Sequence, residues 1–326
     1  MKTVLYSSPF VPPEWVAAHG VRPVRIRPDP RASAPGIGPL MGLCPMARAF
    51  VGEAAARPDT DAVILATTCD QMRRAAELAA RAGPAPVFLM NVPATWQTPA
   101  AARLYRDELL RLGRFLVRLG GREPSPVALC EALEAYDARR ERLRGALGLL
   151  GAREASEALA AFDRGEEPPA PSPPSRPPPR GPAIAVVGGP LMRGDARVFD
   201  VIEEAGGVVV LDGTESGPRT LPAPFDRRRL RDDPLMELVD AYFGAIPDVF
   251  RRPDAALYAW FDRELAAAGA RGIIVWRYVW CDHWAAAVAR LRELTGLPVT
   301  DLDVSGEEGA LARTAHRIQA LVETLT

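Results

Sequence analysis

The chain is nearly without lysine, has no surplus of either charge and contains no long hydrophobic run. Its 326 residues include 40 basic and 41 acidic side chains, and the formal net charge is −1. Lys2 is the only lysine, so arginine supplies almost all of the positive charge. Without a basic surplus there is no electrostatic basis for binding nucleic acid or an anionic membrane surface.

Patterns typical of membrane insertion or secretion are also missing. No stretch approaches the roughly 20 apolar residues that a membrane-spanning helix needs. The first 15 residues, MKTVLYSSPFVPPEW, have one basic side chain and no adequate apolar core before their prolines. We therefore expect a cytoplasmic protein.

Cysteine is scarce, with four residues scattered over the chain, Cys44, Cys69, Cys130 and Cys281. This is too few for a disulfide scaffold, and a reducing compartment would keep the thiols free. No two cysteines form a C-x-x-C pair, so the usual zinc and ferredoxin spacings are absent. The roles that remain open for the four cysteines are packing, metal binding and redox chemistry.

Proline, in contrast, is concentrated in one stretch. Nine of the fifteen residues in PPAPSPPSRPPPRGP, 168–182, are proline. Because proline fixes φ and lacks a backbone donor, this stretch indicates an extended linker. We predict an N-terminal α/β domain with a helical block over 1–165, a linker over 166–182 and a C-terminal α/β domain over 183–326.

Short apolar runs alternate with helical patterns in both halves of the chain. Seven runs are expected to hold strands, at 3–8, 61–68, 86–93, 183–189, 208–213, 271–280 and 298–304. A further strand at 21–26 is weakened by Pro23. Helices are expected at 12–20, 45–56, 70–82, 195–207, 232–245, 253–269, 283–295 and 307–325, and 98–162 is helical without a strand. Apolar runs that are each followed by a helix predict parallel sheets covered on both faces, hence two doubly wound α/β domains with an additional helical block.

Three of the cysteines occupy comparable positions in this pattern. Cys69 follows the strand at 61–68 and opens a helix, Cys281 opens a helix shortly after a strand, and Cys44 precedes a helix that begins with proline. Ligands of such sheets gather beyond the carboxyl ends of the strands. A helix N-terminus also favours the thiolate, which is the form that binds metal. Each cysteine taken alone is more simply a buried packing residue, and Cys130, at an apolar position of a helix, is interpreted as packing.

Four segments together resemble the 2-hydroxyacyl-CoA dehydratase family, which includes subunits of ATP-dependent benzoyl-CoA reductases. They are GLCPMARAF, ATTCDQMRR, WRYVWCDHW and the strand, helix and turn in 188–219, which ends in DGTESGPR. The likeness spans most of the chain outside the proline-rich linker. It implies two Rossmann-like α/β domains, and one [4Fe–4S] cluster per chain held by Cys44, Cys69 and Cys281.

The resemblance also implies an activity and partners. Low-potential single electrons would pass from an ATP-dependent [4Fe–4S] activator protein through the cluster to an acyl-CoA. A homologous second subunit, or a second copy of this chain, would complete the enzyme. Beside the cluster, His283 and Arg73 are expected to be catalytic. The expected substrate-binding residues are Thr214, Ser216, Arg219 and Arg74.

Two departures from the family leave other functions open. The chain is short, and Asp248 follows Pro247 where many members have a further cysteine. Four cysteines also exclude the relatives that carry a double cubane. The alternatives are a reductase of a small non-CoA substrate, a partner subunit without catalytic function, and a zinc protein with three cysteine ligands.

Overall fold

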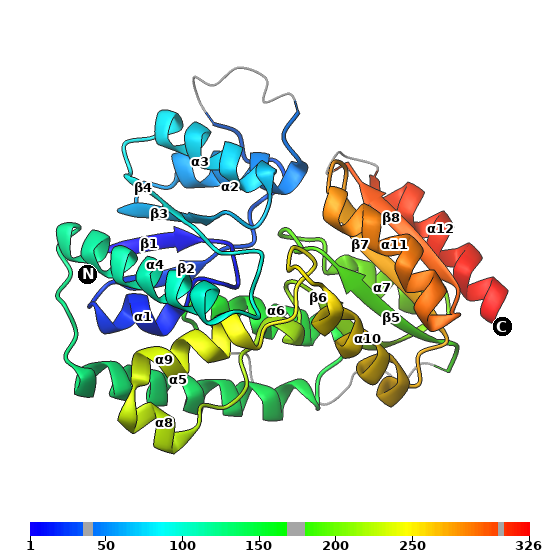
Figure 1. Ribbon diagram of the computed structural model, residues 1–326. Coiled ribbons are helices and arrows are strands. Elements are labelled where there is room, and N and C mark those ends of the chain that lie inside the picture. Colours follow the sequence, from blue (N-terminus) through cyan, green and yellow to red (C-terminus); the bar gives the residue numbers. More distant parts are fainter. Residues whose placement is uncertain (35–41, 168–179, 306–309) are drawn as a thin grey trace.

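The structure, a computed structural model, describes residues 1–34, 42–167, 180–305 and 310–326. The chain forms two four-stranded parallel sheets that lie side by side, each with helices on both faces (Figure 1). The predicted fold class is therefore confirmed. Most of the expected proline-rich linker, 168–179, lies outside the described residues.

The first sheet has the strand order β2-β1-β3-β4. Its strands are β1 (Thr3–Tyr6), β2 (Arg22–Arg25), β3 (Ala62–Ala66) and β4 (Val87–Met90). Helices α2 (Pro45–Ala56) and α3 (Asp70–Ala82) pack on one face, while α1 (Pro13–Ala18) and α4 (Pro99–Arg118) cover the other. Pro23 is tolerated because β2 is an edge strand.

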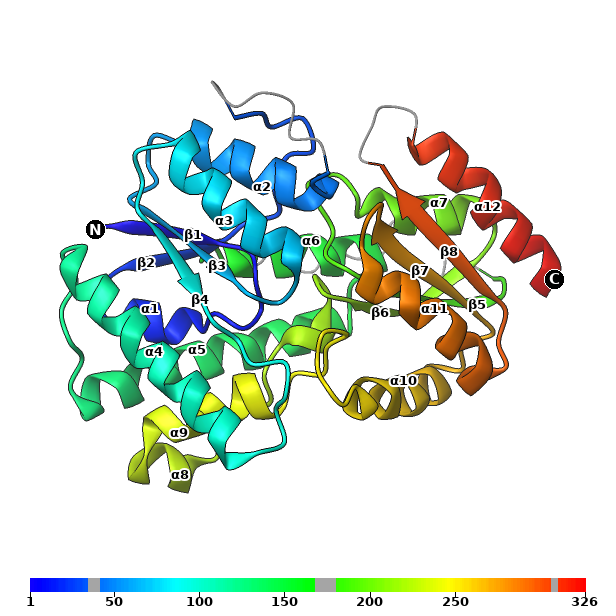
Figure 2. The ribbon, with the colours of Figure 1, turned by 45° about the horizontal axis from the view of Figure 1, so that its top comes forward.

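The second sheet repeats this arrangement with the order β6-β5-β7-β8. Its strands are β5 (Ala183–Gly188), β6 (Val208–Thr214), β7 (Gly272–Tyr278) and β8 (Val299–Val304). Helices α7 (Arg197–Glu204) and α12 (Ala310–Leu325) cover one face, and α10 (Ala255–Ala268) and α11 (Asp282–Thr295) cover the other (Figure 2). β5 and β7 are buried on both faces, which explains their continuous apolar sequence.

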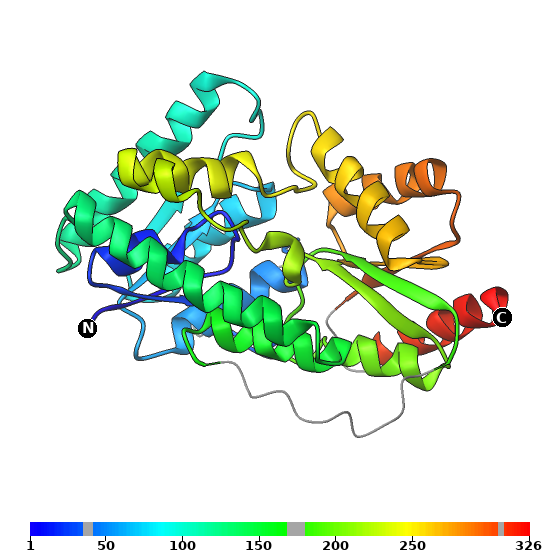
Figure 3. The same cartoon turned by 90° about the horizontal axis from the view of Figure 1, so that it is seen from below.

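Two further helices follow α4, and the second of them bridges the two sheets. Helix α5 (Pro126–Leu147) packs along α1, and α6 (Ala152–Asp163) contacts both β2 of the first sheet and β6 of the second (Figure 3). Within the described ranges, no helix is long and apolar enough to cross a membrane, α5 included.

The chain also returns to the first sheet after β6. It passes through η1 (Pro218–Thr220) and then forms α8 (Arg227–Asp232), α9 (Pro234–Val239) and the π-helix η2 (Asp240–Gly244). Side chains of this segment, including Leu230, Leu238 and Tyr242, share a core with β1 and α4. Residues 245–250 then lead back toward the second sheet.

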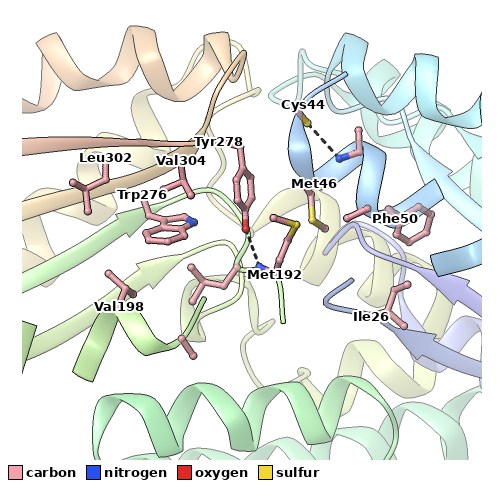
Figure 4. Close-up of a cluster of buried hydrophobic side chains, with 14 of the residues drawn as sticks. Ile26, Cys44, Met46, Phe50, Met192, Val198, Trp276, Tyr278, Leu302 and Val304 are labelled. Atoms are coloured by element: carbon pink, nitrogen blue, oxygen red, sulfur yellow. Dashed lines mark hydrogen bonds between the residues drawn. The ribbon is translucent and has the colours of Figure 1, made fainter. Parts of the chain in front are cut away.

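One hydrophobic core extends from the first sheet into the second. It joins Met46 and Phe50 of α2 to Trp276 and Tyr278 of β7. In Figure 4 the side chain of Met192, from the loop after β5, lies between Tyr278 and Met46. This contact holds the carboxyl ends of the two sheets against each other.

Candidate functional site

Three of the four cysteines are the N-cap residues of helices. Cys44 precedes α2, Cys69 precedes α3 and Cys281 precedes α11. The Cys44 Sγ accepts a hydrogen bond from the backbone N–H of Ala47, at 3.4 Å. Free N–H groups and the helix dipole favour negative charge at such positions, and this contribution lowers the pKa of a thiol.

The same three cysteines line one cavity of about 80 Å³ between the two sheets. Its walls come from segments that follow the carboxyl ends of strands: Ser7 and Ser8 after β1, Thr68 and Cys69 after β3, Pro190 after β5, Glu215 after β6 and Cys281 after β7. We call this cavity the cysteine pocket. Cys130 lies elsewhere, in α5 against the core of the first sheet, as expected of a packing residue.

Burial dominates the acidity of these thiols. It raises the pKa of Cys44 to about 12 and that of Cys281 to about 11, and it also raises the pKa of Cys69. Helix N–H groups lower all three pKa values, as expected from their positions, but by less. Cys69 and Cys281 each raise the pKa of Cys44 further, because their charges are close. Three thiolates in this pocket therefore require a bound cation to hold them.

The chemistry of this donor set fits an iron–sulfur cluster. Thiolates are the usual cluster ligands, and these three come from separate elements that meet in one pocket, where Cys44 is buried and Cys69 and Cys281 are half-buried. In the described part of the chain, no group of three or more histidine, cysteine or acidic side chains could hold a single metal ion. Cluster ligands can lie farther apart, since each thiolate binds a different iron.

The predicted catalytic residues lie in different surroundings. His283, in the first turn of α11, is half-buried and lines the cysteine pocket. Arg73 is exposed on α3 and its Nε lies 3.7 Å from Asp70. Arg74 is also exposed and pairs with Glu77 at 2.5 Å. Neither arginine lines the pocket, and the roles expected of them remain predictions.

The predicted substrate-binding residues of the DGTESGPR turn are buried beside the pocket. The Ser216 Oγ accepts a hydrogen bond from the backbone of Leu191, at 2.9 Å. Thr214 is fully buried, and its Oγ1 has no partner among the described residues. Arg219 donates to the carbonyl oxygens of Gly213 and Pro247.

Arg219 also contacts an acid in the pocket. Its Nη1 lies 3.4 Å from Oδ2 of Asp248, and Asp248 is a pocket wall residue. Arg219 does not itself line the pocket, but it holds the wall residue Asp248 in place. A direct contact of Thr214, Ser216 or Arg219 with substrate stays a prediction.

Sequence reasoning did not select the two carboxylates of the pocket, Glu215 and Asp248. Burial raises the pKa of Glu215 to about 7, and the nearby Asp248 adds to this rise. Glu215 stands inside the DGTESGPR turn, so its position at a strand end could have identified it. Arg25, at the end of β2, is the cation closest to it, with Nη2 3.8 Å from the Glu215 Oε1.

The aromatic residues around Cys281 mostly pack, as expected. Trp276 and Trp284 are buried, whereas Trp280 is exposed and has a φ of 65°. Trp284 and Tyr278 also form walls of the cysteine pocket. The Tyr278 hydroxyl donates to Oδ2 of Asp195 at 2.5 Å and accepts from the Met192 N–H at 2.8 Å.

This contact predicts a pH-dependent stability. Burial raises the pKa of Asp195 to about 6, above its ordinary value of 3.8, although the Tyr278 hydroxyl lowers it. The folded state thus favours the protonated acid, and this stabilisation is lost as the pH rises through about 6. Asp195→Asn should gain stability over the wild type by up to about 3 kcal/mol between about pH 4 and pH 7.

Urea unfolding at a series of pH values measures this difference. The exposed Asp262→Asn serves as the matched control, with a difference from wild type that stays flat across the series. If the stability difference between Asp195→Asn and the wild type were equally independent of pH, burial would not disfavour the charged form of Asp195, and the prediction would be wrong.

Fold and pocket together define a class: a two-domain α/β protein with three helix-capping cysteines at the carboxyl ends of both sheets. The model of the family described as "2-hydroxyglutaryl-CoA dehydratase, D-component" matches residues 9–325. The chain belongs to this family, as the four resembling segments predicted. It is therefore a dehydratase-type enzyme subunit, and the family's description as a component implies a partner subunit.

Comparisons with individual proteins add little. No curated protein matches the sequence. Among solved structures, a mutant of the laminin-binding adhesin Lmb from Streptococcus agalactiae shares 13% identity over 100% of both chains, with a TM-score of 0.23. A likeness this low carries no argument about fold or function.

Proposed function

We propose that this chain is the [4Fe–4S]-bearing subunit of a 2-hydroxyacyl-CoA dehydratase or a benzoyl-CoA reductase-like enzyme. Electrons would come from an ATP-dependent activator protein, and a homologous subunit or a second copy of the chain would complete the enzyme in the cytoplasm. The observation that carries the proposal is the convergence of Cys44, Cys69 and Cys281 in one pocket of a chain that belongs to the dehydratase family.

Each thiolate has a defined function in this proposal. Cys44, Cys69 and Cys281 would hold the cluster between the two domains, and the N-termini of α2, α3 and α11 would offset its negative charge. When bound, such a cluster supplies one-electron chemistry and an iron without a cysteine ligand that can act as a Lewis acid.

The remaining pocket residues would control water and protons. Phe10, Val249 and Phe250 form apolar walls that keep water scarce near the thiolates. His283 lines the same pocket, so its imidazole can hold or deliver a proton at this site. A substrate anion would be bound by arginine, for which Arg73 and Arg74 are the exposed candidates on the helix that Cys69 caps.

A three-component assay tests this function. The cluster-loaded chain, a homologous second subunit and an ATP-dependent activator are combined anaerobically with a reductant and a panel of 2-hydroxyacyl-CoA thioesters. We expect dehydration that requires ATP, the activator and this chain. Turnover that ignores CoA thioesters and consumes a small non-CoA acceptor would instead support the alternative reductase.

A further inference from the structure

Arg25, the last residue of β2, binds two walls of the cysteine pocket from outside it. Its Nε donates to the carbonyl oxygen of Ser7 at 2.8 Å, and its Nη2 donates to that of Glu215 at 3.2 Å. Ser7 and Glu215 both line the pocket, whereas Arg25 does not. One guanidinium therefore joins a wall beside the first sheet to a wall beside the second.

The Arg25 side chain is itself held in place. Only 12% of it is exposed, and its Nη1 lies 3.7 Å from Oδ2 of Asp163, the last residue of α6. Its Nη2 also lies 3.8 Å from Oε1 of Glu215. A guanidinium is a planar fork that bonds several acceptors in fixed geometry. Arg25 thus sets the spacing between the two carbonyl groups that it binds.

Backbone hydrogen bonds continue from Glu215 toward Cys281. The Glu215 N–H lies 3.1 Å from the carbonyl oxygen of Gly188 and 3.2 Å from that of Gly189. The Gly189 N–H in turn donates to the carbonyl oxygen of Trp276 at 2.9 Å, on the strand β7 that leads to Cys281. Gly188 has a φ of 139°, and a Cβ there would collide with the Trp276 carbonyl oxygen, so this close approach requires glycine.

Ser7 is connected to Cys69 in a similar way. Ser7 follows β1, and the neighbouring strand β3 leads to Cys69. Residues 7–10 line the pocket beside Thr68 and Cys69. A change in the distance between the carbonyl groups of Ser7 and Glu215 would therefore change the distance between the thiols of the two sheets.

Arg27, two residues after Arg25, makes a comparable contact away from the pocket. Its Nη2 donates to the carbonyl oxygen of Ser216 at 2.9 Å, and its Nη1 donates to the Ser156 hydroxyl at 2.7 Å. Neither Ser216 nor Ser156 lines the cysteine pocket. Both arginines thus attach the end of β2 to the DGTESGPR turn, but of these two only Arg25 binds pocket walls.

We infer that Arg25 is a positioning residue of the cysteine pocket, which fixes the separation of the thiols of the two sheets through the carbonyl groups of Ser7 and Glu215. The inference rests on the proposed function, because the cluster is the group that this separation fits. Without Arg25 the two walls are free to separate, so the thiolates lose their geometry and water reaches the cluster. Loss of a group that orients metal ligands costs about 10–100-fold in affinity.

Release of iron from anaerobically loaded Arg25→Ala and Arg27→Ala tests the inference. Arg25→Ala should lose iron to a chelator about tenfold faster than the wild type, or more. Electron paramagnetic resonance of its reduced cluster should show shifted g values, because ligand geometry and solvation change. Arg27→Ala is the matched control, since it weakens the same junction, and it should keep the release rate and the g values of the wild type.

Iron and sulfide content of the wild type separates two kinds of failure. A wild-type chain that takes up neither refutes the proposed function, and the inference with it. With a loaded wild type, unchanged g values in Arg25→Ala, or iron release no faster than in Arg27→Ala, overturn only the role of Arg25. If Arg25→Ala does not fold, Arg25→Lys is measured under the same criteria, because lysine keeps the charge beside Asp163 but lacks the planar fork.

Discussion

Replacing Cys69 by serine is expected to lower the iron and sulfide content of the anaerobically reconstituted chain by about tenfold or more. The Cys69 thiol lines the pocket with Cys44 and Cys281, and it caps α3 at the point where β3 ends. Loss of a group that only orients a metal ligand already costs about 10–100-fold in affinity. Cys44→Ser and Cys281→Ser should have the same effect.

Cys130→Ser provides the matched control. Cys130 belongs to α5 and packs against the core of the first sheet, outside the pocket. Its serine variant should keep the iron and sulfide of the wild type. The assignment of ligands would be wrong if Cys130→Ser alone lost iron, or if all four variants behaved alike.

Replacing Arg140 by methionine should destabilise the protein by about 3–5 kcal/mol. Arg140 and Glu14 form a fully buried ion pair between α5 and α1. Tyr242, in the segment that returns to the first sheet, donates to the Glu14 Oε2 at 2.8 Å. Removal of the guanidinium leaves the Glu14 charge buried and uncompensated, which is the source of the cost.

Urea unfolding of Arg140→Met measures this cost. The control is Arg74→Met, which breaks the exposed pair with Glu77 and should change stability by less than about 1 kcal/mol. The double variant Glu14→Leu with Arg140→Met should recover part of the loss, because neither charge of the pair remains. The recovery is partial because the buried Asp137, 3.7 Å from Arg140, then keeps only Arg227 as a cation partner among the described residues. Equal effects of Arg140→Met and Arg74→Met would show that the buried pair does not hold α1 and α5 together.

Much of the fold follows from local sequence pattern. The predicted helices at 45–56 and 70–82 agree with α2 and α3 to the residue, since Pro45 marks the beginning of α2 and Asp70, after the N-cap Cys69, marks that of α3. The long expected helix at 232–245 instead comprises parts of α8, α9 and η2. Asp233 and Pro234 end one helix and begin the next, as capping chemistry allows.

The path of the chain between the domains could not be predicted in this way. Leu230 and Leu238 lie on amphipathic helices, but periodicity does not specify which sheet such a helix covers. Sequence pattern is limited in the same way for the residues of the pocket. The cysteine positions at strand ends indicated a common site. Glu215 and Asp248 line the same pocket, but their places depend on tertiary contacts with Arg25 and Arg219, which the pattern does not specify.

The measurement that tests the central claim most directly is the iron and acid-labile sulfide content of the wild-type chain, reconstituted without oxygen. One [4Fe–4S] cluster held by Cys44, Cys69 and Cys281 predicts about four irons and about four sulfides per chain. A chain that takes up neither, or that binds a single zinc ion in their place, would contradict the account.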